Sequence, residues 1–423
     1  MKFLLISYSE IDGVGQHVVS LNSNLQKMGY QSKAILLHKK QSSNQNIIKI
    51  KKSLFFRIIF FFLEFIKKDF KDLFSFGNST IKYSSIKKYV EESDIIIIYS
   101  MHKILSLNVL EKIFKTNKIV YLRPLDWEFA TGGCHLNILD NGEVCNKFYK
   151  DCDNCPKLNI FNFFNLSKKI LKKKKEVLEK YRPKIFVENN FTKDIYNKSQ
   201  VTKKIKTETI FLGVNKERTN FISKTDARKN LNIDEADKII LFGTFNMDAP
   251  HKGGRIIENI LKIFVSNLYK NKFHDFSRIK LVTFGRKNTF NINIPEIKWI
   301  HYGEIHSNDK LNLLYRAADV FASPSTGCNG PHIVLEALTN DLPVVAFNQG
   351  VAQDSVIDGI NGYLVPCFDK EIFSKSISKA LFFNDLNYKD VKNEKLKQVF
   401  NSSYEAKMIV ENASMDFKKI VIK

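Results

Sequence analysis

The sequence predicts an α/β protein with two Rossmann-like domains, each built around a parallel β-sheet. Short, continuously apolar runs alternate with helix-length segments whose apolar residues recur every three or four positions, as at Val18, Leu21 and Leu25. Strands that are buried on both faces and joined by helices form parallel sheets. The chain has 423 residues, which is too long for one ordinary hydrophobic core, so two domains are expected.

About six strands are expected in each half of the chain. In the first half they are the apolar runs at 2–7, 33–38, 94–100, 118–124, 184–189 and 208–214. In the second half they lie at 239–245, 280–285, 299–304, 319–324, 342–347 and 362–365. This symmetry predicts an N-terminal domain over 1–205, a C-terminal domain over 206–400, and a final helix over 401–423 that crosses back to the first domain or stays with the second.

One segment, KKSLFFRIIFFFLEFIKKDFKDLFSF at 51–76, interrupts the alternation. Arg57, Glu64 and Lys68 share one helical face, and most of the remaining residues are Phe, Ile or Leu. The apolar part, about 14 residues, is too short to span a bilayer. An interfacial helix whose flanking lysines meet anionic headgroups fits this pattern. A phenylalanine-rich core helix is the alternative.

The formal net charge of +22 narrows the possible partners. A basic surface suits nucleic acid, anionic lipid or phosphorylated ligands. The chain carries no DNA- or RNA-binding motif, and its basic runs, such as 168–175, are typical of solvated helix faces, so no nucleic-acid partner is expected. The N-terminus lacks the apolar region of a signal peptide, and no run reaches the length of a membrane span. These features predict a cytosolic protein.

Glycines follow the first predicted strand of each domain. Gly13 and Gly15 precede the first helix, where backbone amides can approach a phosphate; a plain tight turn is the alternative. Gly243 and the PHKGG segment at 250–254 repeat this pattern in the second domain. There Lys252, followed by Gly253, can meet a phosphate as a point charge.

The run at 302–366 contains the most specific motifs of the chain. It resembles the family-four retaining glycosyltransferases, which have the GT-B fold, and the likeness extends more weakly over the rest of the chain. The matching positions are Tyr315, Ala317, Ala318, Asp319, Val320, Phe321, Pro324, Ser325, Leu335, Glu336, Ala337, Pro343, Val344, Val345, Ala346, Asp358, Gly359, Asn361, Gly362, Tyr363, Leu364 and Val365.

The resemblance implies a nucleotide-sugar donor, linked to UDP or GDP, on the second domain and an acceptor on the first. Glu336 matches the second acid of the family's E-x7-E motif and is expected to hold the ribose. Lys252 matches the lysine that neutralises the leaving diphosphate. The backbone at Asn329, Gly330 and Pro331 is expected near the donor phosphates and sugar. No catalytic metal is needed, because a lysine and helix N-termini can offset the diphosphate charge.

Two departures from the family concern the donor site. Cys328 stands where relatives have the first acid of the motif, and the arginine usually found a few residues before Lys252 is missing. A neutral thiol does not accept the hydrogen bonds of a carboxylate. Three explanations remain open: Asn329 and backbone amides hold the sugar, the donor carries an unusual sugar, or the protein has lost activity.

Four of the six cysteines fall in one stretch at 123–158. Cys134, Cys145, Cys152 and Cys155 form a compact cluster that includes a C-x-x-C pair. In a cytosolic chain such a cluster favours a metal site over disulfides, and soft thiolates favour structural zinc. Free or redox-active thiols and disulfides are the alternatives.

The same stretch resembles a branch of the glycosyltransferase family found in bacterial surface-polysaccharide pathways. That branch carries the pattern D-x4-T-G-G-C-H followed by C-x6-C-x2-C-P, and this chain has a longer gap between Cys134 and Cys145. The loop makes Arg123, Asp126 and His135 candidates for the acceptor site, with Asp126 also a catalytic candidate. That these residues only brace the loop is the alternative.

These observations predict a retaining GT-B glycosyltransferase at the cytoplasmic face of the inner membrane. Its acceptor is expected to be a saccharide, linked to a polyprenyl diphosphate, in O-antigen, capsule or exopolysaccharide synthesis. One rival is a catalytically degenerate scaffold, which Cys328 and the missing arginine favour. Another is a nucleotide-sugar epimerase, which shares two Rossmann domains but requires a convergence of acids and a histidine that the sequence does not identify.

Overall fold

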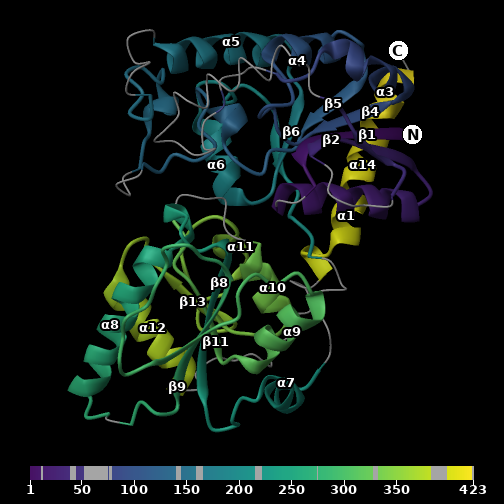
Figure 1. Cartoon of the computed structure of the whole chain (residues 1–423). Coiled ribbons are helices and arrows are strands. Elements are labelled where there is room, and N and C mark those ends of the chain that lie inside the picture. The colour runs from purple at the N-terminus through teal and green to yellow at the C-terminus, as the bar shows by residue number, and fades with distance from the viewer. Residues whose placement is uncertain are drawn as a thin grey trace. The chain divides into compact units, whose positions relative to one another are not determined.

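The computed structural model describes residues 1–10, 13–38, 44–51, 75, 79–139, 144–158, 165–214, 222–273, 275–326, 332–382 and 398–421 (Figure 1). The chain divides into two compact units. The first comprises Met1–Phe211 together with Ser402–Lys423, and the second is Leu212–Asn401.

The first unit contains a parallel sheet whose described strands lie in the order β3-β2-β1-β4-β5-β6-β7. Two of them, at Ile95–Ile98 and Ile119–Leu122, are apolar throughout, as the two covered faces of a parallel sheet require. The strands are β1 (Lys2–Ser9), β2 (Gln31–His38), β3 (Ile47–Lys49), β4 (Ile95–Ile98), β5 (Ile119–Leu122), β6 (Lys184–Val187) and β7 (Thr207–Thr209).

Alternate side chains of this sheet enter two separate cores. Leu4 and Ile6 of β1 pack with α4 (Leu107–Phe114), α5 (Leu166–Tyr181) and α6 (Asn190–Lys198), and α3 (Lys87–Glu92) joins this layer. Phe3 and Leu5 face the other way, onto α1 (Gly13–Lys27) and α14 (Ser402–Val421). In Figure 1 the yellow α14 lies beside the purple α1, so the C-terminal helix completes the layer begun by the first helix.

The second unit repeats the plan with described strands in the order β10-β9-β8-β11-β12-β13, all parallel. Its strands are β8 (Lys238–Asn246), β9 (Ile279–Arg286), β10 (Lys298–His301), β11 (Val320–Ser323), β12 (Val344–Phe347) and β13 (Gly362–Val365). Its helices are α7 (Lys224–Leu231), α8 (Gly254–Lys270), α9 (Asn308–Ala317), α10 (Ile333–Thr339), α11 (Val351–Ser355) and α12 (Lys370–Phe382). Helices α8 and α12 pack together over one face of the sheet.

Both sheets have a topological switch point at their first strand. In each, the chain adds strands on one side of the first strand and then returns to its other side, which places β4 beside β1 and β11 beside β8. Open α/β sheets bind ligands beyond the carboxyl ends of the strands at this point. The loops after β1 and β4, and those after β8 and β11, are therefore the places to look for a site.

Three sequence predictions differ from the structure or lie beyond it. The short strand β3 was not expected, and β7 pairs with β6, so the first unit extends to Phe211 rather than ending at residue 205. The predicted interfacial helix at 51–76 falls almost wholly outside the described residues. Among the described helices, none combines the length and apolar character needed to cross a membrane.

Candidate functional site

The loops at the switch point of the second unit are tied to one another by hydrogen bonds. Lys252 ends a short 3-10 turn after β8, Pro250–Lys252, and its side chain is half-buried. The backbone N–H of Thr326, in the loop after β11, donates to the carbonyl of His251 at 2.9 Å. The Gln349 amide, in the loop after β12, donates to the carbonyl of Ser325. Three neighbouring strands thus support the backbone around Lys252.

The turn that carries Lys252 requires glycine at its next position. Gly253 has φ +83°, in the left-handed region, and a Cβ built there would lie 2.4 Å from the carbonyl oxygen of Pro324. α8 begins at the following residue, so the lysine stands at the entrance to a helix N-terminus. A cation beside free backbone N–H groups favours an anionic ligand.

Glu336 lies in α10, which follows the loop after β11, and is only 5% exposed. The hydroxyl of Tyr315, from α9, donates to its Oε2 at 2.9 Å. Burial with a defined partner fixes the orientation of the carboxylate. The other predicted residues of this loop, Cys328, Asn329, Gly330 and Pro331, lie outside the described residues.

The remaining glycines predicted to bind the donor have different surroundings. Gly243 lies inside β8, and a Cβ there would collide with the ring of Phe284, so packing accounts for this glycine. Gly13 is exposed, and no atom of the described residues lies within 4 Å of a built Cβ. Gly15 is buried, and its Cβ would lie 1.9 Å from the carbonyl oxygen of Ser9. Their donor-binding roles stay predictions.

In the first unit, three side chains form a hydrogen-bonded row beyond the carboxyl ends of β4 and β5. The Nδ1 of His135 lies 2.6 Å from Oδ2 of Asp126, and its Nε2 lies 3.2 Å from Nδ1 of His102. Burial lowers the pKa of His135, but the Asp126 carboxylate outweighs this effect and the pKa is raised overall. The row pairs a carboxylate with an imidazole that holds its proton more strongly than usual.

Glu128 connects this row to the backbone that follows β4. Its Oε2 accepts from the Ser100 hydroxyl at 2.9 Å and from the next two backbone N–H groups at 2.9 and 3.2 Å. Ligand atoms of Asp126, Glu128 and His135 lie within 4.8 Å of one another, the spacing of a cation site. Because the Glu128 carboxylate already stabilises the backbone after β4, the group serves better as a bracing network.

Arg123 has no exposed surface, although the sequence offers it as an acceptor-binding residue. Its guanidinium donates to Oε1 of Glu405 at 2.7 Å and to the carbonyl of Phe186 at 3.2 Å. A residue engaged in this way is poorly placed to contact a substrate. The geometry favours the alternative that Arg123 braces the structure.

Glu188, directly after β6, is a buried acid that the sequence did not single out. Burial raises its pKa to about 8, while the Arg123 guanidinium acts in the opposite direction. Its Oε1 accepts from the Thr192 hydroxyl at 3.1 Å, and its Oε2 has no hydrogen-bond partner in the described part of the chain. At neutral pH this side chain is therefore mainly the neutral acid.

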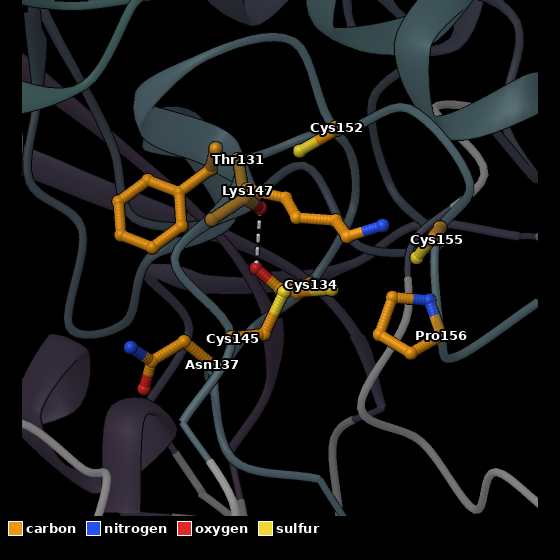
Figure 2. Close-up of a pocket in the computed structure, with 9 residues that line it drawn as sticks. Thr131, Cys134, Asn137, Cys145, Lys147, Cys152, Cys155 and Pro156 are labelled. Carbon is orange, nitrogen blue, oxygen red and sulfur yellow. Dashed lines mark hydrogen bonds between the residues drawn. The ribbon is translucent and has the colours of Figure 1, made fainter.

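The four clustered cysteines line one pocket in the loop between β5 and α5 (Figure 2). Cys134 precedes the antiparallel bridge between Ile138 and Val144, and Cys145 directly follows it. Cys152 and Cys155 lie in the turn that comes next. All four are free thiols. The prediction that they gather in space is consistent with this arrangement, and their metal remains a proposal.

Two of these thiols influence each other directly. Cys134 donates a hydrogen bond to Cys155, which lowers the pKa of Cys155 and raises that of Cys134. Burial raises the pKa of Cys152 to about 11. The pocket therefore favours the Cys155 sulfur as the thiolate and holds the thiols of Cys134 and Cys152 in the protonated form.

A family comparison decides what the second unit is. Residues 223–397 match the model of the family described as glycosyl transferases, group 1. The second unit therefore resembles the group 1 glycosyltransferases over most of its length. The match lies within Leu212–Asn401 and includes both Lys252 and Glu336. No curated protein sequence matches the chain.

Solved structures resemble the whole chain in fold. Sucrose-phosphate synthase from Thermosynechococcus elongatus has a TM-score of 0.68 at 16% identity, covering 99% of this chain and 100% of its own. Anabaena HepE in complex with UDP and glucose gives 0.62 at 13% identity, with coverage of 98% and 99%. WaaG, a glycosyltransferase involved in lipopolysaccharide biosynthesis, gives 0.60 at 12% identity, with coverage of 94% and 95%. The predicted GT-B fold class, with two Rossmann-like sheets, is confirmed.

The first unit also contains candidate functional residues that the sequence analysis did not identify. His102 contacts His135 through its ring, and the backbone N–H of Glu128 donates to Oδ1 of Asp126 at 2.8 Å. His102 comes shortly after a predicted strand, so its position at a carboxyl strand end was a usable signal. The role of Glu128 depends on backbone hydrogen bonds that no sequence pattern expresses.

Proposed function

We propose that the chain transfers a sugar from a UDP- or GDP-linked donor, with retention of configuration, to a saccharide acceptor. The observation that carries this proposal is the match to the group 1 family over a unit in which Lys252 ends the turn after β8 and Glu336 lies in α10, the helix that follows the neighbouring strand β11. A nucleotide-sugar donor has an anionic diphosphate and a ribose with two hydroxyl groups. A lysine at a helix N-terminus suits the first, and a fixed buried carboxylate suits the second.

In this proposal the barrier is departure of the nucleoside diphosphate from an oxocarbenium-like sugar. Lys252 and the helix N-terminus after Gly253 stabilise the charge that develops on the leaving group. Glu336 positions the nucleotide through its ribose. The loop at 327–331, with Cys328 and Asn329, is proposed to contact the sugar. That HepE was solved with UDP-glucose supports a nucleotide-sugar donor for this fold.

We place the acceptor on the first unit, at Asp126 and His135. Asp126 is the more open of the two, with 23% of its side chain exposed against 11% for His135. The Asp126 carboxylate is oriented by the His135 imidazole and can accept a hydrogen bond from a hydroxyl group of the acceptor. The proposed acceptor is a lipid-linked saccharide of bacterial surface polysaccharide, at the cytoplasmic face of the inner membrane. The involvement of WaaG in lipopolysaccharide synthesis supports this class.

The experiment separates donor binding from transfer. A panel of UDP- and GDP-sugars is first screened by thermal stabilisation of the wild-type protein. Transfer to a synthetic polyprenyl-diphosphate saccharide is then measured with the donor that stabilises most. Glu336→Gln, which can still accept from the Tyr315 hydroxyl, should lower both donor stabilisation and transfer, the latter by about 100-fold. Asp126→Asn should lower transfer while donor stabilisation persists.

Glu371→Gln, an exposed glutamate in α12, is the matched control and should behave as wild type. Near-normal transfer by folded Glu336→Gln protein would refute the donor-site assignment. If no nucleotide sugar stabilises the wild-type protein, the degenerate scaffold becomes the better description.

A further inference from the structure

We infer that Cys134, Cys145, Cys152 and Cys155 bind one zinc ion, which clamps the loop between β5 and α5. This inference concerns the first unit alone and does not depend on the sugar donor. It begins with placement: the sulfur atoms, drawn in yellow in Figure 2, surround one pocket although the cysteines span more than 20 positions of the chain. The cavity is about 10 Å³, the size of an ion rather than of a substrate.

The backbone holds Cys145 close to Cys134. Ile138 and Val144 form an antiparallel bridge, and the backbone N–H of Cys145 donates to the carbonyl of Asn137 at 2.7 Å. The residues between them, 140–143, lie outside the described part of the chain, so the bridge closes the longer gap that separates this cysteine pair from the family pattern. The spacing in the sequence does not show whether Cys134 and Cys145 lie close together, and the bridge between Ile138 and Val144 brings the two ends of the gap together.

The turn from Cys152 to Cys155 brings both cysteines to the lining of the same pocket. Cys152 and Asn154 both adopt left-handed φ values, 55° and 46°. The exposed Lys147 donates from its Nζ to the carbonyls of Asp153 and Asn154, at 3.0 and 2.9 Å, and so stabilises the turn. Paired cysteines on a turn of this type are one half of a four-thiolate zinc site.

The charge balance also suits a thiolate-bound cation. The backbone N–H of Lys157 donates to the sulfur of Cys155, as amides do around metal thiolates. When four cysteines bind Zn²⁺ as thiolates, those still protonated release their protons to solvent, and the complex carries two negative charges in excess. Lys147 and the buried Lys157, whose Nζ donates to the carbonyl of Leu136 at 2.6 Å, bring two positive charges to the same loop.

Zinc binding must draw the sulfur atoms closer than they lie in the structure. Among groups of three or more His, Cys, Asp or Glu residues in the described part of the chain, only Asp126, Glu128 and His135 have ligand atoms that all lie within 4.8 Å of one another. Rotation of cysteine side chains around a shared pocket supplies such a shift without moving the core. Since Cys134 directly precedes His135, the ion would also hold the imidazole beside Asp126, a consequence that rests on the proposed acceptor site.

The first test is the metal content of full-length protein purified without a metal-affinity tag. We expect about one zinc per chain, and replacement of any one of the four cysteines by serine should reduce this to near zero. Cys367→Ser is the matched control, because Cys367 is an exposed cysteine of the second unit, and it should retain the zinc. Retention of zinc by all four variants and its loss in Asp126→Asn would overturn the assignment in favour of the carboxylate–imidazole group.

A second measurement uses the wild-type protein alone and stands even if the serine variants fail to fold. Addition of a strong chelator should make four further thiols reactive toward a thiol reagent and lower the melting temperature. The zinc site would be refuted if the purified protein contained no metal and the number of reactive thiols did not change on addition of the chelator. An intact mass lower by the hydrogens of one or two disulfides would refute it in favour of oxidised cysteines. Transfer activity is not a readout here, so failure of the proposed function leaves the zinc result intact.

Discussion

Gly13 and Gly15 are two positions apart, but only one of them lies where a Cβ atom would collide with its neighbours. The start of α1 passes so close to the end of β1 that a Cβ at Gly15 would overlap the carbonyl oxygen of Ser9. Gly13 faces open space. A phosphate-binding loop and a tight turn both place glycines here, and the contact with Ser9 shows that at least Gly15 is required by packing.

We therefore expect Gly15→Ala to destabilise the protein and Gly13→Ala to have little effect. The overlap is with backbone, so α1 must shift, at a cost of about 3 kcal/mol or more. Gly13→Ala should change the free energy of unfolding by less than about 0.5 kcal/mol. Chemical denaturation of the two variants beside wild type measures the difference. Equal stability of the variants would contradict the assigned packing.

The position of a residue at a strand end could be predicted where a local motif carries it, and contacts between distant segments could not. Lys252 and Glu336 were expected from local patterns, and both lie in the matched group 1 domain. The burial of Arg123 depends on Glu405, which lies 282 residues away. No pattern within one segment reveals such a long-range contact. Arg123 was therefore predicted to bind the acceptor.

At the scale of elements, the C-terminal helix α14 is attached to the first unit by a buried ionic group. Glu405 accepts from Arg123 at 2.7 Å and lies 2.8 Å from Nε2 of His17 on α1. Burial disfavours the charged carboxylate, but His17 and Arg123 prevail and lower its pKa to about 2. The ionised form of Glu405 therefore stabilises the docking of the helix.

Glu405→Gln should destabilise the protein by about 3 kcal/mol at neutral pH, because it leaves the buried Arg123 without its counter-charge. Since the pKa of Glu405 falls on folding from 4.5 to about 2, its contribution is complete above pH 4.5 and is lost as the pH falls toward 2. The difference in stability between wild type and variant should shrink over that interval. Glu411→Gln, an exposed change on the same helix, is the control and should be nearly neutral. A constant difference across this pH range would contradict the ionic role of Glu405.

Most elements followed from apolar runs, because strands of a covered parallel sheet are apolar throughout. β3 was missed because it has only three residues, Ile47–Lys49, which is too short for a periodic pattern. The run at 208–214 was read as one strand, but only its beginning pairs with β6, as β7, and its last residues belong to the second unit. Pairing partners, rather than local composition, set these boundaries.

At the scale of the whole molecule, two units that each contain a parallel sheet were predictable from the repeated alternation of strand-like and helix-like runs. Assignment of Ser402–Lys423 to the first unit was not, because the helix is equally compatible in sequence with either sheet. Its apolar face, including Ala406 and Ile409, enters the core beside α1. A chain that ends in the unit where it began is a property of topology, which periodicity does not encode.

The net charge of +22 and the segment at 51–76 together predict binding to anionic membranes. Replacement of Lys51, Lys52, Lys67 and Lys68 by glutamate should release the protein from vesicles that contain phosphatidylglycerol. With about 1 kcal/mol for each lysine near the surface, the partition coefficient should fall by more than about 100-fold. Binding of wild type should also weaken as salt screens the headgroups. Co-sedimentation with vesicles measures both effects.

A matched control separates position from total charge. Lys229, Lys270, Lys298 and Lys375 are exposed lysines of the second unit, and their replacement by glutamate removes the same charge. Each change removes two positive units, so both variants fall from +22 to +14. If the segment is an interfacial helix, its variant should detach while the control remains bound, because apolar burial and local lysines act together there. Equal release of both variants would show that binding follows net charge alone, and retention of both would favour the phenylalanine-rich core helix.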